Sequence, residues 1–159
     1  MKLYHGSNIA VENPKILQAD RKLDFGTGFY LTSSYEQAKR WAFLTLKRRG
    51  EGKQIITCFH TDEKIIDSLN VLRFDKADEQ WLEFISQNRN VSDFVDKHDI
   101  VIGSVANDRT MPVIRLYFAG IYDEAETVKR LLPQKLKDQF AFKTERALKA
   151  LEFCEVITL

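Results

Sequence analysis

Apolar and polar residues alternate in several short stretches of the chain, a pattern that is typical of half-buried strands. Residues 54–59 give the clearest example, and glycine, asparagine, aspartate and proline separate the stretches from one another. The predicted strands cover residues 2–4, 28–32, 54–59, 71–74, 99–105, 138–143 and 153–158. The segment from residue 8 to residue 24 is polar and irregular, with a turn at Asn13 and Pro14.

Helical spacing is strongest after residue 33. Ser33 and Glu36 form the pattern of a capping box, in which each side chain bonds the other residue's backbone amide. Gly50 is placed to end this helix in the left-handed conformation. The cluster of Lys47, Arg48 and Arg49 lies at the negative end of the helix dipole. We therefore interpret these residues as stabilising the helix C-terminus rather than as forming a nucleic-acid site. The buried face is predicted to hold Ala38, Trp41, Ala42 and Thr45.

Four more helices are predicted in the second half of the chain. Asp75 or Asp78 caps a helix whose inward face carries Trp81, Phe84 and Ile85. Further helices are expected at residues 112–119, before Gly120, and at residues 123–132, before Pro133. Thr144 caps a short helix over residues 145–150. Because strands and helices are interspersed without regular alternation, the predicted class is α+β.

Length and composition indicate one soluble domain over residues 1–159. The 24 Lys and Arg residues nearly balance the 23 Asp and Glu residues, so no general electrostatic attraction to nucleic acid is expected. Cys58 and Cys154 both lie in apolar stretches, and we expect two buried thiols. The first residues lack the apolar core of a signal peptide, and no apolar run is long enough to span a membrane, so we expect a cytoplasmic protein without membrane contact.

Common catalytic signatures are absent from the sequence. There is no phosphate-binding lysine loop, and the glycines of residues 26–28 precede a strand rather than a helix, unlike a dinucleotide fingerprint. The three histidines are far apart in sequence and give no local support for a metal site. Three other segments stand out together: YHGS at residues 4–7, GFYLT at residues 28–32 and DQFAF at residues 138–142.

In this order the three segments resemble the motifs of ADP-ribosyltransferases of the diphtheria-toxin and poly-ADP-ribose-polymerase type, the His–Tyr–Glu group. The chain is more similar still to a small bacterial domain family of unassigned function that is placed near those enzymes. That similarity rests on YHGS, on DFGTGFY at residues 24–30, on VANDR at residues 105–109 and on FKTE at residues 142–145. The resemblance implies a split mixed β-sheet with flanking helices, and NAD as the substrate.

The resemblance also implies a role for each matching residue. His5 corresponds to the histidine that hydrogen-bonds a ribose hydroxyl of NAD, and Gly6 to the glycine whose backbone pairs with the nicotinamide carboxamide. Ser7 corresponds to a hydroxyl near the ribose. Tyr30 corresponds to the tyrosine that stacks on the nicotinamide ring, and Trp41 falls where the family has a second stacking aromatic residue. The serine that the polymerases use to bind the carboxamide is replaced by an alanine in this chain, Ala38.

The third motif departs from the family pattern, because Gln139 stands where the catalytic glutamate is expected. A glutamine can donate and accept hydrogen bonds but carries no charge to stabilise a developing ribose cation. Glu145 is the nearest carboxylate in sequence, and its position after Thr144 favours a helix-start role over a catalytic one. The sequence at residues 107–109 is most simply a polar turn, and a place at the rim of the pocket is the alternative for Asp108 and Arg109.

We therefore expect an NAD-dependent mono-ADP-ribosyltransferase with an unknown acceptor, or a slow NAD glycohydrolase. Two alternatives stay open. The first is a non-catalytic module that binds NAD or ADP-ribose, and the second is a transferase that modifies a base or a phosphate of a nucleic acid. No metal cofactor is expected, and the acceptor can be a protein or a nucleic acid.

Overall fold

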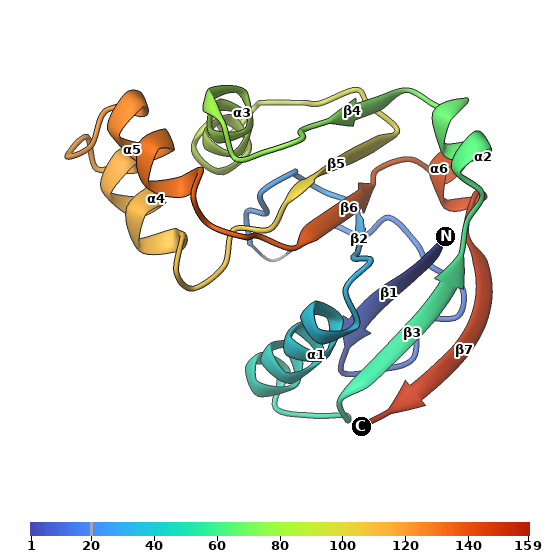
Figure 1. The fold of residues 1–159 in the computed structure, drawn as a ribbon. Helices are drawn as coiled ribbons and strands as arrows, with labels where there is room; N and C mark the ends of the chain where they lie inside the picture. The colour runs from blue at the N-terminus through green and yellow to red at the C-terminus, as the bar shows by residue number, and fades with distance from the viewer. Residues whose placement is uncertain (20) are drawn as a thin grey trace.

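A computed structural model describes residues 1–19 and 21–159 of the chain. It is an α+β structure with two separate sheets, as predicted, which lie one above the other in Figure 1. The first sheet contains three strands in the order β1 (Lys2–Ser7), β3 (Ile55–His60) and β7 (Glu152–Thr158), and both pairs are antiparallel. The start and the end of the chain thus belong to one sheet.

The second sheet contains four strands in the order β2 (Phe29–Leu31), β6 (Asp138–Phe142), β5 (Ile100–Ser104) and β4 (Val71–Arg73). The β4–β5 pair is parallel and the other pairs are antiparallel, so the sheet is mixed. Because β2 and β6 pair, the glycine-rich segment before β2 lies beside a strand that is more than one hundred residues away in sequence.

In the part of the chain that the structure describes, the two sheets meet at one backbone bridge. The amide of Tyr4 in β1 donates to the carbonyl of Thr32, and the amide of Thr32 donates back, at 2.9 and 3.0 Å. Beyond this bridge β2 pairs with β6 instead of continuing along β1. The molecule therefore has a split between β1 and β2, and this split positions the candidate site.

Helix α1 (Tyr35–Arg49) packs against one face of the first sheet (Figure 1). Ala38 and Ala42 are fully buried there, so the close approach depends on small side chains. Helices α3 (Glu79–Asn90), α4 (Met111–Phe118) and α5 (Glu124–Leu131) gather at the second sheet, where Trp81 is fully buried in an apolar cluster. The other large cluster joins the two sheets through Leu3, Phe29 and Phe59.

Most of the predicted helix boundaries are confirmed. Gly50 ends α1 with φ of 73°, and its amide donates to the carbonyl of Leu46. Asp78, rather than Asp75, caps α3, and its side chain accepts from the amide of Trp81. Thr144 caps α6 (Glu145–Leu148) in the same way.

The predicted capping box of α1 is wrong by one residue. Ser34 is the cap and accepts from the amide of Gln37. Ser33 is instead bound to Asp138 at the start of β6, through its amide at 2.8 Å and through its hydroxyl. A contact between residues so distant in sequence overrides the local preference for a cap.

Two further expectations need correction. Cys58 is buried in β3, as expected, but Cys154 is exposed because β7 forms the outer edge of its sheet. The short helix α2 (Glu63–Asp67) was not predicted, although Asp62 caps it. Its five residues are too few to display a helical repeat in the sequence.

Candidate functional site at the split between the sheets

Gly6 presents its backbone to the split. In an antiparallel ladder the amide and carbonyl of successive residues point alternately to the two sides of a strand. Since Tyr4 turns both groups toward Thr32, Gly6 turns its amide and carbonyl to the same edge. The β1–β2 pairing has ended by that point, so a donor and an acceptor of the backbone face the opening.

His5 lies beside this edge with one ring nitrogen fixed. Its Nδ1 is 2.8 Å from the carbonyl oxygen of Tyr30, which can only accept, so Nδ1 carries the hydrogen. Burial lowers the pKa of His5, and the hydrogen bond to Tyr30 opposes that shift. The imidazole is therefore neutral near pH 7, and its Nε2 is left as a hydrogen-bond acceptor.

A cleft of about 820 Å³ opens at the split, within the range of small-molecule sites. His5, Gly6 and Ser7 line it from β1, and Gly28 and Phe29 line it from the start of β2. The polar segment after β1 closes one side. The C-terminal end of α1 contributes Thr45, Arg48 and Arg49. We call this space the split cleft.

The packing of β1 against α1 explains why position 6 is a glycine. A Cβ at this position would lie 1.9 Å from the carbonyl oxygen of Ala38 and 2.9 Å from the amide nitrogen of Ala42. Gly6 is thus required by the packing of β1 on the backbone of α1, whether or not a ligand approaches it.

Tyr30 contributes its backbone to the split but turns its ring the other way. Its hydroxyl donates to the carbonyl of Gly26 at 2.7 Å and accepts from the amide of Phe25 at 3.0 Å. Burial raises the pKa of Tyr30, so the phenol stays protonated. The ring packs with the Trp81 cluster, and Tyr30 does not line the split cleft. The aromatic ring beside His5 is that of Phe29, stacked at 4.3 Å between centroids.

Gln139 lies near the other end of β2. Tyr30 faces Ala141 across the β2–β6 pair, and alternation puts the side chains of Gln139 and Ala141 on one face of β6. Tyr30 and Gln139 thus share a face of the second sheet. Gln139 is buried, and its Nε2 donates to the carbonyl of Ser104 at 3.3 Å, which leaves Oε1 as an acceptor.

Glu145 and Trp41 lie apart from the split cleft. Glu145 is exposed on the first turn of α6, beyond the opposite end of β6 from Gln139, which is where a helix-start residue belongs. Trp41 is partly buried on α1 and does not line the cleft. The structure therefore brings His5, Gly6 and Ser7 together in the split cleft, whereas the side chains of Tyr30, Gln139, Trp41 and Glu145 do not line it.

Several residues that line the split cleft were not predicted from the sequence. Arg48 and Arg49 do occupy the last turn of α1, as predicted, but they also line the cleft. Phe29, which the sequence places on a strand, also lines the cleft. Lys15 comes from the irregular segment, where no pattern marks a ligand contact. The run of basic residues just before Gly50, which ends α1, is the feature of the sequence that could have indicated a role for Arg48 and Arg49 in the cleft.

Asp108, in the turn between β5 and α4, forms an exposed ion pair with Arg40 of α1. Asn107 organises this turn, since its side-chain oxygen accepts from the amides of Arg109 and Thr110. Neither Asp108 nor Arg109 lines the split cleft.

Within residues 1–19 and 21–159, no group of three or more His, Cys, Asp or Glu side chains gathers as a metal site requires. None of the helices in that part of the chain is both long and apolar enough to cross a membrane.

Comparison with known protein families gives one finding. The family described as "Protein of unknown function (DUF3990)" matches residues 1–153. No curated protein and no solved structure matches the chain.

Proposed function

The chain belongs to the DUF3990 family, and we propose that it binds NAD in the split cleft and transfers ADP-ribose to an acceptor, or hydrolyses NAD slowly. The proposal joins the resemblance of its YHGS, GFYLT and DQFAF segments to the ADP-ribosyltransferase superfamily with the geometry of the split. The observation that carries it is the pairing of a neutral His5 with the open backbone edge of Gly6.

A nicotinamide carboxamide has one carbonyl acceptor and one amino donor group. The amide and carbonyl of Gly6 are complementary to such a group, because one donates and the other accepts. Nε2 of His5 is an acceptor, and a ribose hydroxyl is a matching donor. Ser7 lies on the same face of β1 as His5, where its hydroxyl supplies a further polar contact.

The cationic end of α1 suits the other part of NAD. Arg48 and Arg49 lie at one side of the split cleft, and a diphosphate carries negative charge that guanidinium groups bind well. Phe29 offers an apolar face beside His5.

In the proposed reaction the bond between the ribose and the nicotinamide nitrogen breaks. Its electron pair leaves with the nicotinamide, and the ribose passes through an oxocarbenium-like state that water or an acceptor attacks while losing a proton. Hydrogen bonds and dipoles near the ribose stabilise that state. By resemblance Gln139 holds the catalytic position on β6, and a neutral amide offers no full charge, so a slow reaction is expected. Its buried side chain shares the face of Tyr30 and does not line the split cleft, so this role requires the nicotinamide ribose to reach the far end of β2.

Two substitutions of His5 separate ribose binding from structure. An asparagine side chain reaches the position of Nδ1 and can still donate to Tyr30, but it has no atom at the position of Nε2. A glutamine side chain reaches the position of Nε2. We expect NAD to raise the melting temperature of the native protein, since a ligand that binds only the folded state stabilises it. His5→Asn should lose this shift, and His5→Gln should keep part of it.

The control is the melting temperature of each variant without NAD. A native protein that is folded but shows no shift with millimolar NAD contradicts the proposal. Equal shifts in all three proteins would place NAD away from His5.

Catalysis is tested at Gln139 with Glu145 as the matched comparison. We expect Gln139→Ala to abolish nicotinamide release and Glu145→Gln to leave it unchanged. Gln139→Glu should raise the rate, because the added charge acts mainly on the transition state. Nicotinamide release and the mass of ADP-ribosylated products from a lysate give the readout. Loss of activity on changing Glu145 alone would assign the carboxylate role to α6.

A second function is favoured by one observation, the uncharged Gln139. A module that binds NAD or ADP-ribose without turning it over needs the split cleft but no carboxylate. Tight binding of ADP-ribose with no nicotinamide release from the native protein would select this alternative.

A further inference from the structure

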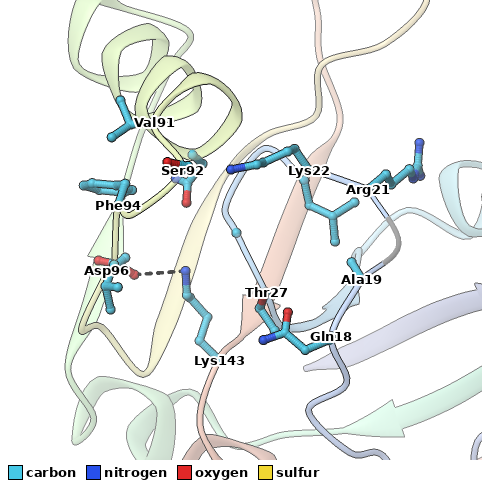
Figure 2. Close-up of a pocket in the computed structure, with 14 residues that line it drawn as sticks. Gln18, Ala19, Arg21, Lys22, Thr27, Val91, Ser92, Phe94, Asp96 and Lys143 are labelled. Atoms are coloured by element: carbon cyan, nitrogen blue, oxygen red, sulfur yellow. Dashed lines mark ion pairs between the residues drawn. The ribbon is translucent and has the colours of Figure 1, made fainter.

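A second pocket lies at the other end of β6. It has a volume of about 640 Å³ and is formed by the segment before β2, the end of α3 with the loop that follows it, and Lys143 just after β6 (Figure 2). Lys143 and Gln139 are at opposite ends of β6. Among the described residues, this pocket shares no lining residue with the split cleft, although Gly28 of the cleft adjoins Lys143. We call it the Lys143 pocket.

Its floor contains two buried charges. Nζ of Lys143 is 3.3 Å from Oδ2 of Asp96, and the two side chains are only 8% and 5% exposed. Lys143 also donates to the carbonyl of Phe25. Oδ1 of Asp96 lies 2.5 Å from Nδ1 of His98, and Oδ2 faces the Lys143 ammonium in an ion pair that lacks hydrogen-bond geometry. The ion pair compensates the charge of Oδ2 but leaves it without a well-formed hydrogen bond, which a ligand donor would supply.

A second acceptor lies close by. Asn88 donates its Nδ2 to the carbonyl of Phe84 at 2.9 Å, which leaves its Oδ1 facing Gly26. A Cβ at Gly26 would lie 2.7 Å from this Oδ1 and 3.0 Å from Nζ of Lys143. The polar groups of Asn88 and Lys143 therefore converge on the space beside Gly26, and the floor offers two acceptors and an ammonium group.

The mouth of the pocket has different chemistry. The side chain of Lys22 extends toward Ser92 in Figure 2, and both residues are exposed. Phe94 lines one wall, together with Leu23 and Val91. A ligand that fits all of these groups has an anionic group at the mouth and a flat ring against the wall. The edge of that ring at the floor carries mainly hydrogen-bond donors.

We propose that the Lys143 pocket binds a guanine nucleotide. Guanine presents two adjacent donors, the ring N1–H and the 2-amino group, beside one acceptor, O6. The donors complement Asp96 and Asn88, and O6 complements Lys143. The phosphate lies toward Lys22. Adenine lacks the ring N–H, so its edge leaves one floor acceptor without a donor. This inference is independent of NAD binding.

Isothermal titration calorimetry of the full chain with GMP, IMP, AMP and inorganic phosphate tests the proposal. We expect GMP to bind saturably. IMP, which lacks the 2-amino group, should bind about tenfold more weakly, the equivalent of one lost hydrogen bond. AMP and phosphate should bind more weakly again. The comparison of GMP with IMP needs no variant and does not depend on how substitutions affect folding.

Two matched variants locate the site. Lys22→Gln should weaken GMP binding about fivefold through the lost phosphate contact, whereas Lys149→Gln, which removes an exposed lysine outside the pocket, should leave it unchanged. A short single-stranded RNA with one guanine distinguishes the free nucleotide from guanine in a strand. Tighter binding of the RNA would assign the pocket to the strand.

No saturable GMP binding at millimolar concentration overturns the proposal. Equal affinity for GMP, AMP and phosphate also overturns it, because the floor would then play no part. Equal effects of the two lysine substitutions would place any binding outside this pocket.

Discussion

The split cleft and the Lys143 pocket are both lined by the segment that connects β1 with β2, but the polar groups inside them differ in charge. At the split, the inner groups are neutral: a histidine, a glycine backbone and a serine, all on one strand. In the Lys143 pocket, an ammonium and a carboxylate are buried together. The first arrangement needs the strands to hold backbone groups in place, and the second needs two charges to compensate each other.

This difference predicts where the free energy of folding depends on polar groups. The Lys143 pocket should respond strongly to the loss of one charge, while the split cleft should respond to changes in packing and, weakly, to pH. The substitutions below test that contrast from the largest expected effect to the smallest.

Lys143→Met should lower the free energy of unfolding by about 3–5 kcal/mol, because it leaves the buried Asp96 carboxylate without its counter-charge. Urea unfolding measures the loss. The double variant Lys143→Met with Asp96→Asn should recover much of it, since no buried charge remains. Lys149→Met removes an exposed lysine and should change stability by less than about 0.5 kcal/mol. A loss equal to that of Lys149→Met would show that the pair contributes nothing.

These two regions also differ in how far the sequence predicts them. His5, Gly6 and Ser7 are adjacent in the chain and end a strand, so a local motif was enough to bring them together. Phe25, Asp96 and Lys143 come from three distant segments. No spacing rule relates a lysine after one strand to an aspartate in a loop 47 residues earlier (143 − 96).

The difference between the expected and the observed direction of the Tyr30 ring has the same physical origin. The ring of Tyr30 was expected in the nicotinamide pocket, but its hydroxyl is engaged by the backbone of residues 25 and 26. Which face of β2 looks toward the split depends on the sheet that β2 joins, and the partner strand, β6, is over one hundred residues away. Strand and helix positions follow local patterns, whereas the direction of a side chain on a short strand follows tertiary pairing.

Gly6→Ala should destabilise the protein by about 3 kcal/mol, at the upper end for overpacking, since the new Cβ meets the backbone of α1. Gly28 provides the comparison within the split cleft. A Cβ there would lie 3.0 Å from the carbonyl oxygen of Phe142, which requires a small adjustment. Gly28→Ala should therefore cost about 1 kcal/mol or less. Similar losses for the two variants, measured by urea unfolding, would contradict the packing role of Gly6.

His5 should make the protein less stable in mild acid. Its pKa is lower in the folded protein than the ordinary value of 6.5, so the unfolded chain binds a proton first as the pH falls. The stability from a neutral His5 is complete well above pH 6.5 and declines below it, until the folded protein is protonated as well. In that window the decline is at most about 1.4 kcal/mol per pH unit. His5→Gln should remove this part of the slope between pH 8 and pH 5. An unchanged slope would mean that His5 does not titrate differently on folding.

Asp138 gives the smallest expected loss of stability and tests whether the split is held from the β6 side. Its carboxylate accepts from the hydroxyl of Thr32 at 2.9 Å and from the amide and hydroxyl of Ser33. These bonds tie the strand that carries Gln139 to the start of α1. Asp138→Asn keeps the shape but removes the charge and replaces one acceptor by a donor, so we expect a loss of about 1 kcal/mol, because the group is only half-buried. Hydrogen exchange gives the sharper readout, since the amide of Ser33 should exchange faster while the amides of β5 stay protected. Arg40→Gln, which breaks the exposed ion pair between Arg40 and Asp108, is the control and should change neither quantity appreciably. If Ser33 exchanges at the native rate in Asp138→Asn, the β2–α1 turn is held by the Tyr4–Thr32 bridge alone, and the position of Gln139 relative to the split does not depend on Asp138.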